Sequence, residues 1–123
     1  MKKAFIYLMT ILPFASFAQQ TPMFVGTYTS KTESKGIYVY NFDVKTGNAT
    51  LLSTQESKDP SFLARSNNFI YAVNEVPNQE GTVSAYSFKD GHLTFLNSLP
   101  SGGGAPCFVE VHPNGSLLAV ANY

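Results

Sequence analysis

The sequence has little of several features that would point to a particular class of protein. Charged residues make up only 13% of the 123, the formal net charge is +0, and like charges do not run together. A basic nucleic-acid binder is therefore not expected. There is no tryptophan and a single cysteine, Cys107. One thiol can form no internal disulfide and no multi-cysteine zinc site, so we expect the fold to depend on packing alone.

Cys107 and the two histidines give no sign of a catalytic or metal-binding role. Cys107 stands at the start of an apolar run without the base that a reactive thiol needs, so we expect a small buried residue. His92 follows an Asp-Gly turn, and His112 is expected at a hairpin on the opposite end of its strands from Asn122. Histidines 20 residues apart, without carboxylates at ligand spacing, do not indicate a metal site. No cofactor is expected.

The beginning of the chain has the composition of a secretory signal peptide. Two lysines precede an apolar run over residues 4–14, and small residues flank a cleavage site after Ala18. We expect residues 1–18 to be removed, and residues 19–123 to lie in the periplasm or outside the cell with no membrane attachment. The alternative is an N-terminal anchor that stays in place.

The remainder alternates short runs of β-type residues with turn signals and shows no helical period. Asp90-Gly91 and Asn114-Gly115 are the strongest hairpin turns, because these pairs adopt positive φ at low cost. The expected strands are residues 23–28, 36–42, 49–53, 61–64, 69–74, 82–88, 93–99, 108–111 and 117–123.

These strands repeat along the chain. The Tyr-Asn-Phe of residues 40–42 recurs as Tyr-Ser-Phe 46 residues later, and the Pro-Ser-Phe-Leu that begins at Pro60 recurs at Pro106, also 46 residues later. The run from Tyr71 to Glu75 matches the one that ends at Tyr123, 48 residues later. Four antiparallel strands in each period correspond to one blade of a β-propeller, although a β-sandwich also places turns at such spacing.

The positions within the repeat predict how the blades are divided. Residues 60–99 make one four-stranded blade, residues 23–53 supply three strands of a preceding blade without its inner strand, and residues 106–123 supply two inner strands of the next. A closed propeller needs at least four blades. We therefore expect residues 19–123 to be the N-terminal blades of an incomplete propeller, with the others supplied by a longer chain, and this piece alone to be inactive.

The recurring residues resemble the opening of the propeller lactonase family, which contains bacterial 6-phosphogluconolactonases and fungal carboxymuconate-lactonizing enzymes. The resemblance implies an all-β, seven-bladed propeller that hydrolyses a sugar-type lactone, a small molecule, without a metal. Many members have histidine where this chain has Phe108, and the His and Arg residues proposed as catalytic lie in later blades. The residues that carry the resemblance are Val25-Gly26-Thr27-Tyr28-Thr29, Lys35-Gly36-Ile37-Tyr38-Val39-Tyr40, Pro60-Ser61-Phe62-Leu63-Ala64, Tyr71-Ala72-Val73-Asn74-Glu75, Gly81-Thr82-Val83-Ser84-Ala85-Tyr86, Pro106-Cys107 and Ala121-Asn122-Tyr123.

The candidate site residues lie where second strands end, at one mouth of the central channel. Glu75 could act as a general base if burial makes it more basic, or be an exposed loop residue. Asn74 and Asn122 could bind substrate through their amides, or satisfy backbone groups at strand ends. Tyr28 and Tyr123 could present hydroxyls to substrate, or serve in packing. A lactonase is thus one hypothesis, and an exported binding scaffold without catalysis is the alternative.

Two further features lie near this rim. Ser61 and Cys107 enter it from the inner strands. Residues 101–104, Ser-Gly-Gly-Gly, could suggest a phosphate cradle, but neither a helix nor a lysine follows. We expect a flexible loop that leads into the next blade.

Overall fold

The computed structural model describes residues 20–123, so the predicted signal peptide over residues 1–18 lies outside the described residues. Within this range the chain is all-β. Its strands are β1 (Gln20–Gly26), β2 (Gly36–Asp43), β3 (Ala49–Glu56), β4 (Pro60–Ser66), β5 (Phe69–Asn74), β6 (Glu80–Lys89), β7 (His92–Gly104), β8 (Pro106–Val111) and β9 (Leu118–Asn122).

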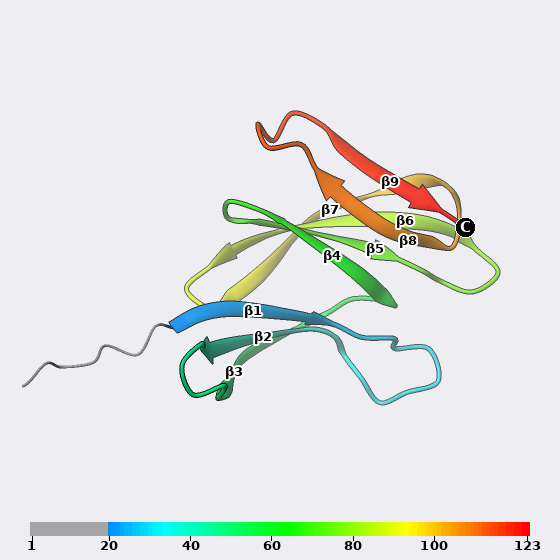
Figure 1. Cartoon of the computed structure of the whole chain (residues 1–123). Coiled ribbons are helices and arrows are strands. Elements are labelled where there is room, and N and C mark those ends of the chain that lie inside the picture. The colour runs from blue at the N-terminus through cyan, green and yellow to red at the C-terminus, as the bar shows by residue number, and fades with distance from the viewer. Residues whose placement is uncertain (1–19) are drawn as a thin grey trace, which may run out of the picture.

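The strands form three antiparallel sheets with the orders β1-β2-β3, β4-β5-β6-β7 and β8-β9. Figure 1 shows the three sheets following one another in chain order, from β1–β3 through β4–β7 to β8–β9. This division into three, four and two strands confirms the one predicted from the repeat. The chain therefore presents one complete blade between two partial ones.

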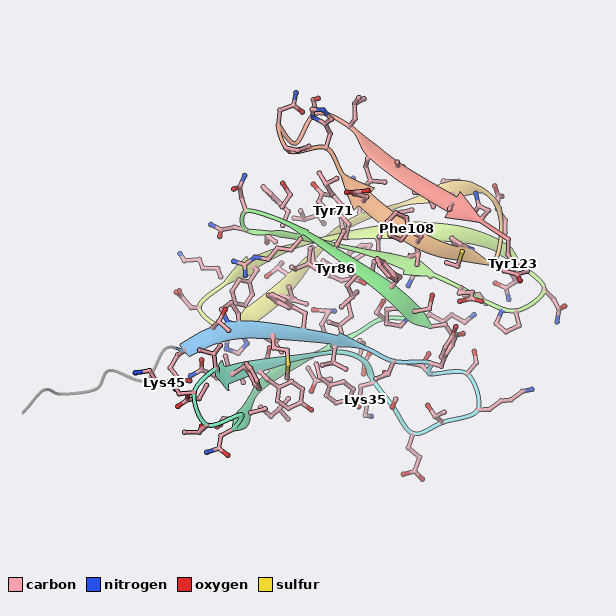
Figure 2. The ribbon with its side chains drawn as sticks, viewed as in Figure 1. Lys35, Lys45, Tyr71, Tyr86, Phe108 and Tyr123 are labelled. Carbon is pink, nitrogen blue, oxygen red and sulfur yellow. The ribbon has the colours of Figure 1, made fainter. Side chains whose placement is uncertain are left out.

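The core fills the space between the first two sheets. Strand alternation points Ile37 and Val39 of β2 and Ile70 and Ala72 of β5 toward each other, and all four are at most 1% exposed. Tyr86 of β6 joins them, and Figure 2 shows its side chain between the two sheets. Full burial of one such large apolar side chain stabilises the fold by about 1.5–3 kcal/mol. These contacts dock the first sheet onto the second.

Two glycines allow each sheet to approach the proline that opens the next inner strand. A Cβ atom on Gly26 would lie 2.2 Å from the carbonyl oxygen of Pro60. A Cβ atom on Gly81 would lie 2.0 Å from Cδ of Pro106. Any side chain at these positions would push neighbouring sheets apart at the rim where the candidate site lies.

Strand β7 is longer than the sequence predicts. It continues through Ser101 to Gly104, and Gly104 pairs with Glu80 at the start of β6. The expectation of a flexible loop over residues 101–104 is therefore wrong. Backbone pairing does not need side chains, so a glycine-rich segment can extend a strand although its composition does not predict one.

The expectation of a buried Cys107 is also wrong, because this residue is exposed. The register of both inner strands shifts just after their opening prolines, between Pro60 and Phe62 and between Pro106 and Phe108. Such a bulge leaves one residue without a cross-strand partner. At the equivalent position in β4 the Oγ atom of Ser61 is buried, so the exposure of Cys107 follows from its place in the two-stranded third sheet, which no further sheet of the described residues covers. The Cys107 thiol lies 3.6 Å from the carbonyl oxygen of Ala121.

Candidate functional site

A polar hollow of about 530 Å³ opens at the rim where the ends of the three sheets meet. Tyr28 comes shortly after β1, Glu75 directly after β5 and Tyr123 directly after β9, so the repeat places all three at the same rim. The structure thus brings together three of the five predicted site residues. The hollow is lined by Tyr28, Glu75, Val76, Pro77, Asn78, Gln79, Glu80, Gly104, Ala105 and Tyr123.

Tyr28 and Glu75 are joined directly. The Tyr28 hydroxyl donates a hydrogen bond of 2.7 Å to Oε2 of Glu75. This bond is the largest cause of a raised pKa for the Tyr28 phenol, and burial and the negative charge of Glu75 act in the same direction. The neighbouring Ser61 hydroxyl acts in the opposite direction. The phenol is therefore protonated at neutral pH and serves as a donor.

Ser61 is placed beside this pair by the bulge in β4. Its Oγ atom is buried, and among the described residues it has no partner in hydrogen-bonding geometry. A buried hydroxyl without a partner costs about 1–3 kcal/mol. Ser61 is therefore a buried polar group next to the Tyr28 phenol, whose pKa it lowers.

Asn74 lies outside the lining of the hollow and is only 5% exposed. Its amide nitrogen donates to Oγ of Ser57 at 3.1 Å and to the carbonyl oxygen of Lys58 at 2.6 Å. Its amide oxygen accepts from the hydroxyls of Thr82 and Ser84. These contacts tie the end of β5 to the segment that leads out of the first sheet. Substrate binding by Asn74 stays a prediction.

Asn122, the counterpart of Asn74 in the third sheet, is exposed. Its amide nitrogen donates to the carbonyl oxygen of Ser101 at 3.1 Å, and its amide oxygen accepts from the Ser101 hydroxyl at 2.8 Å. Tyr123 is fully exposed, and its backbone N–H donates to the carbonyl oxygen of Ala105 at 3.1 Å. Figure 2 shows Tyr123 at the end of the chain, on the rim. Substrate binding by these two residues also stays a prediction.

Asp59 is a residue of this rim that the sequence argument missed. It is fully buried, and its carboxylate accepts hydrogen bonds from the backbone N–H and the hydroxyl of both Thr29 and Ser30. Burial raises the pKa of Asp59, but the hydrogen bonds from Ser30 and Thr29 outweigh it and the net shift is downward. The partners lie about 30 residues upstream, so spacing could not reveal them. The one available signal was an aspartate where the next repeat has Ala105.

A second hollow, of about 580 Å³, lies between the four-stranded sheet and β9. Its lining is mainly apolar and holds no carboxylate or histidine. Figure 2 shows Tyr71, one of the lining residues, on the side of the sheet toward β8 and β9. Of these two hollows, the polar one is the better candidate site, because only its lining includes a carboxylate, that of Glu75, with a tyrosine hydroxyl hydrogen-bonded to it.

The described residues contain neither a metal-ligand cluster nor a membrane-spanning helix. Between residues 20 and 123 no group of three or more His, Cys, Asp or Glu side chains is placed to hold a metal ion. The same part of the chain contains no helix long and apolar enough to cross a membrane.

One four-stranded sheet between two partial sheets, with a rim where the second strands end, is the arrangement of part of a β-propeller. The chain belongs to the family described as lactonase, 7-bladed beta-propeller, which it matches over residues 22–123. The family and the fold predicted from the sequence are thereby confirmed.

Curated relatives include two 6-phosphogluconolactonases. The protein from Formosa agariphila is 38% identical over 107 residues, and the one from Bacillus subtilis is 32% identical over 114 residues. These matches cover 82% and 81% of this chain, respectively, and 30% of each relative. The chain thus spans less than a third of the length of the relatives that it matches.

Solved structures give the same relationship. A Bacteroides fragilis protein, proposed to be a 6-phosphogluconolactonase, is 37% identical with a TM-score of 0.79, over 90% of this chain and 31% of its own. The periplasmic gluconolactonase of Pseudomonas aeruginosa is 29% identical with a TM-score of 0.73, over 85% of this chain and 31% of its own. Both support the arrangement of the strands.

Proposed function

We propose that this chain forms part of a lactonase that hydrolyses a sugar-type lactone, and that the hollow around Tyr28, Glu75 and Tyr123 belongs to its active site. The observation that carries the proposal is the hydrogen bond between Tyr28 and Glu75 in a rim-side hollow of a lactonase-family propeller. Lactone hydrolysis needs a base, a positioned water and groups that hold the ring.

In this proposal Glu75 is the general base. One carboxylate oxygen, Oε2, accepts the Tyr28 hydroxyl, which fixes the orientation of the group. The other oxygen takes a proton from the attacking water as the water oxygen bonds to the lactone carbonyl carbon. When the tetrahedral intermediate collapses, the ring C–O bond breaks and the departing alkoxide takes the proton from Glu75. The product is an open-chain hydroxy acid, and Glu75 is again a carboxylate.

The other predicted residues bind the substrate in this proposal. The exposed ring of Tyr123 and the Tyr28 phenol offer aromatic surface and oxygen atoms to the sugar. Asn122 uses one amide N–H toward Ser101 and has a second for a substrate hydroxyl. Asn74 has both amide N–H groups engaged, so it would contact substrate only by releasing Ser57 or Lys58.

The proposal extends to the substrate and the compartment. Glu75 and Glu80 both line the hollow, and their negative charge disfavours a phosphate dianion there. A neutral sugar lactone outside the cytoplasm is the substrate that agrees with this charge. Export is supported by the composition of residues 1–18 and by the periplasmic location of the Pseudomonas aeruginosa relative. Fractionation of cells that express the full chain, meaning the complete propeller that includes residues 1–123, tests it.

The function is tested by following acid release from glucono-δ-lactone and from its 6-phosphate in a pH-stat, with the spontaneous rate subtracted. We expect the full chain to hydrolyse the neutral lactone at least tenfold more efficiently than the phosphorylated one, because about 1.4 kcal/mol of repulsion corresponds to that factor. A reversed preference would refute the substrate assignment. Hydrolysis of neither lactone would refute the lactonase proposal and leave the binding scaffold as the better hypothesis.

A further inference from the structure

Asp59 is connected to both members of the Tyr28–Glu75 pair. Its side chain accepts from the backbone N–H groups of Thr29 and Ser30, both at 2.7 Å, directly after Tyr28. Its own backbone carbonyl oxygen accepts the N–H of Glu75 at 3.0 Å. One buried residue therefore holds the segment that carries the phenol and the residue that carries the carboxylate.

The Thr29 side chain also binds the backbone of Asp59. Its hydroxyl accepts the N–H of Asp59 at 3.1 Å and lies 3.3 Å from the carboxylate oxygen Oδ1. The Ser30 hydroxyl donates to the other carboxylate oxygen. With hydrogen bonds to both oxygens, the Asp59 carboxylate has little freedom to rotate, and the loop after Tyr28 is fixed with it.

The next repeat separates the roles of the backbone and the side chain. Ala105 occupies the equivalent position, with a φ of 45° against 43° at Asp59. Its carbonyl oxygen accepts a hydrogen bond from the N–H of Tyr123 at 3.1 Å, just as the carbonyl oxygen of Asp59 accepts one from the N–H of Glu75. The backbone link is thus common to both blades and needs no carboxylate. Of these two equivalent positions, only Asp59 has a carboxylate, and it lies at the interface where Tyr28 contacts Glu75.

We propose that Asp59 is a positioning residue, which fixes the loop after Tyr28 so that the phenol is held against the Glu75 carboxylate. Its importance for hydrolysis rests on the proposed function. The geometric claim, that loss of the Asp59 carboxylate separates Tyr28 from Glu75, does not depend on it.

The test uses two variants of the full chain, D59A and D59N, and reads the ionisation of Tyr28. The titration of Tyr28 is obtained by difference. The tyrosinate absorbance of each protein is measured against pH, and that of the same protein carrying Y28F is subtracted. In the parent protein we expect its pKa above the ordinary 10.0, because the protonated phenol donates a hydrogen bond to Glu75. In D59A it should fall toward 10.0, since the loop is released and the negative charge of Asp59, which makes the smallest contribution to the raised pKa, is also removed. D59N should lie between, because asparagine tolerates the positive φ and keeps one oxygen for the two backbone N–H groups.

S84A is the matched control. Ser84 is also buried and donates to Asn74 at 2.6 Å, but it does not contact Tyr28 or its loop. S84A should lower the stability without changing the pKa of Tyr28. Both D59A and D59N remove the charge of Asp59, so the difference between them reports the loop. If both variants leave that pKa as in the parent protein or lower it equally, or if S84A lowers it as much as D59A does, the positioning role is wrong.

The activity of the same variants separates this inference from the proposed function. If Asp59 acts through Tyr28, D59A should lower kcat about as much as Y28F, and adding D59A to Y28F should cause no further loss. Additive losses would contradict the inference while the lactonase proposal stands. A protein without lactonase activity that still shows the Tyr28 pKa shift in D59A would refute the proposed function and support the positioning role.

Discussion

Tyr28 and Glu75 are 47 residues apart, and one hydrogen bond between their side chains connects the first sheet to the second at the rim. Tyr28 is 53% exposed, so its hydroxyl contributes little to the core. In the proposed mechanism the Tyr28 hydroxyl occupies one carboxylate oxygen of Glu75 and leaves the other for the attacking water. The effect of this residue should therefore be seen in activity and not in stability.

Y28F removes the hydroxyl and keeps the ring. We expect kcat for lactone hydrolysis to fall about tenfold, the equivalent of one hydrogen bond of about 1.4 kcal/mol, with an unchanged unfolding midpoint. Y40F is the matched control, since the Tyr40 hydroxyl is not seen to form a hydrogen bond within residues 20–123 and its position in β2 is remote from the hollow. Equal losses in the two variants would mean that the Tyr28 hydroxyl has no special role.

Asp59 makes the free energy of unfolding depend on pH in the acidic range. Its pKa is held below the ordinary value of 3.8, so its contribution is fully present above that pH and is lost as the pH falls through the folded-state pKa. D59N should lower the free energy of unfolding at pH 7 and flatten its decline below about pH 4. Urea unfolding at several pH values measures this.

Asp43 provides the comparison for that measurement. Backbone N–H groups of Lys45 and Thr46 lower its pKa as well, but it lies in an exposed hairpin turn. D43N should therefore change the acid dependence less than D59N does. A larger effect of D43N would contradict the importance given to the buried carboxylate.

At the scale of the element, the rim depends on how closely each sheet approaches the next inner strand. Gly81 is buried, and a Cβ atom there would overlap Pro106. G81A should therefore destabilise the protein by about 1–3 kcal/mol, as overpacking does. G104A is the matched control, because a Cβ atom at Gly104 would meet nothing within 4 Å. Thermal unfolding distinguishes them, and equal midpoints would show that the sheets can separate without cost.

The strands were the most predictable elements, and the reasons are local. Alternating apolar residues and Asp-Gly or Asn-Gly turns locate β6, β7 and the β8–β9 hairpin, and the 46-residue spacing divides them into sheets. The glycine-rich end of β7 was missed because only its pairing with Glu80 makes it a strand. The exposure of Cys107 was missed because an apolar run does not reveal whether another sheet covers it, and among the described residues none covers the outer side of β8–β9.

The site was predictable as a place but not as a set of contacts. Its position after each second strand follows from the repeat, and so Tyr28, Glu75 and Tyr123 were found together. The bond between Tyr28 and Glu75 depends on loop conformations that no periodicity encodes. Asp59 was missed for the same reason, since its partners Thr29 and Ser30 lie in a loop of the preceding sheet.

At the scale of the whole molecule, the backbone hydrogen bonds of the strands lie within single sheets, while side-chain contacts, both apolar and polar, hold neighbouring sheets together. Besides the core, the Arg65 guanidinium lies 5.6 Å from the ring centre of Phe24 in the first sheet and 5.8 Å from that of Phe88 in the second. Phe62 and Phe108 pack between the inner strands of the second and third sheets, with ring centres 4.9 Å apart. Because the hollow takes residues from all three sheets, it exists only when they are docked.

The central claim is that Glu75 acts as the base of a lactonase, and the rates of E75Q and E80Q against the parent protein test it most directly. Both residues line the hollow, and both substitutions remove one negative charge. With glucono-δ-lactone in the full chain, we expect E75Q to lose about 10²–10⁴-fold in kcat, the range for a general base, and E80Q to stay within about twofold. Equal activity of E75Q and the parent protein would contradict the claim.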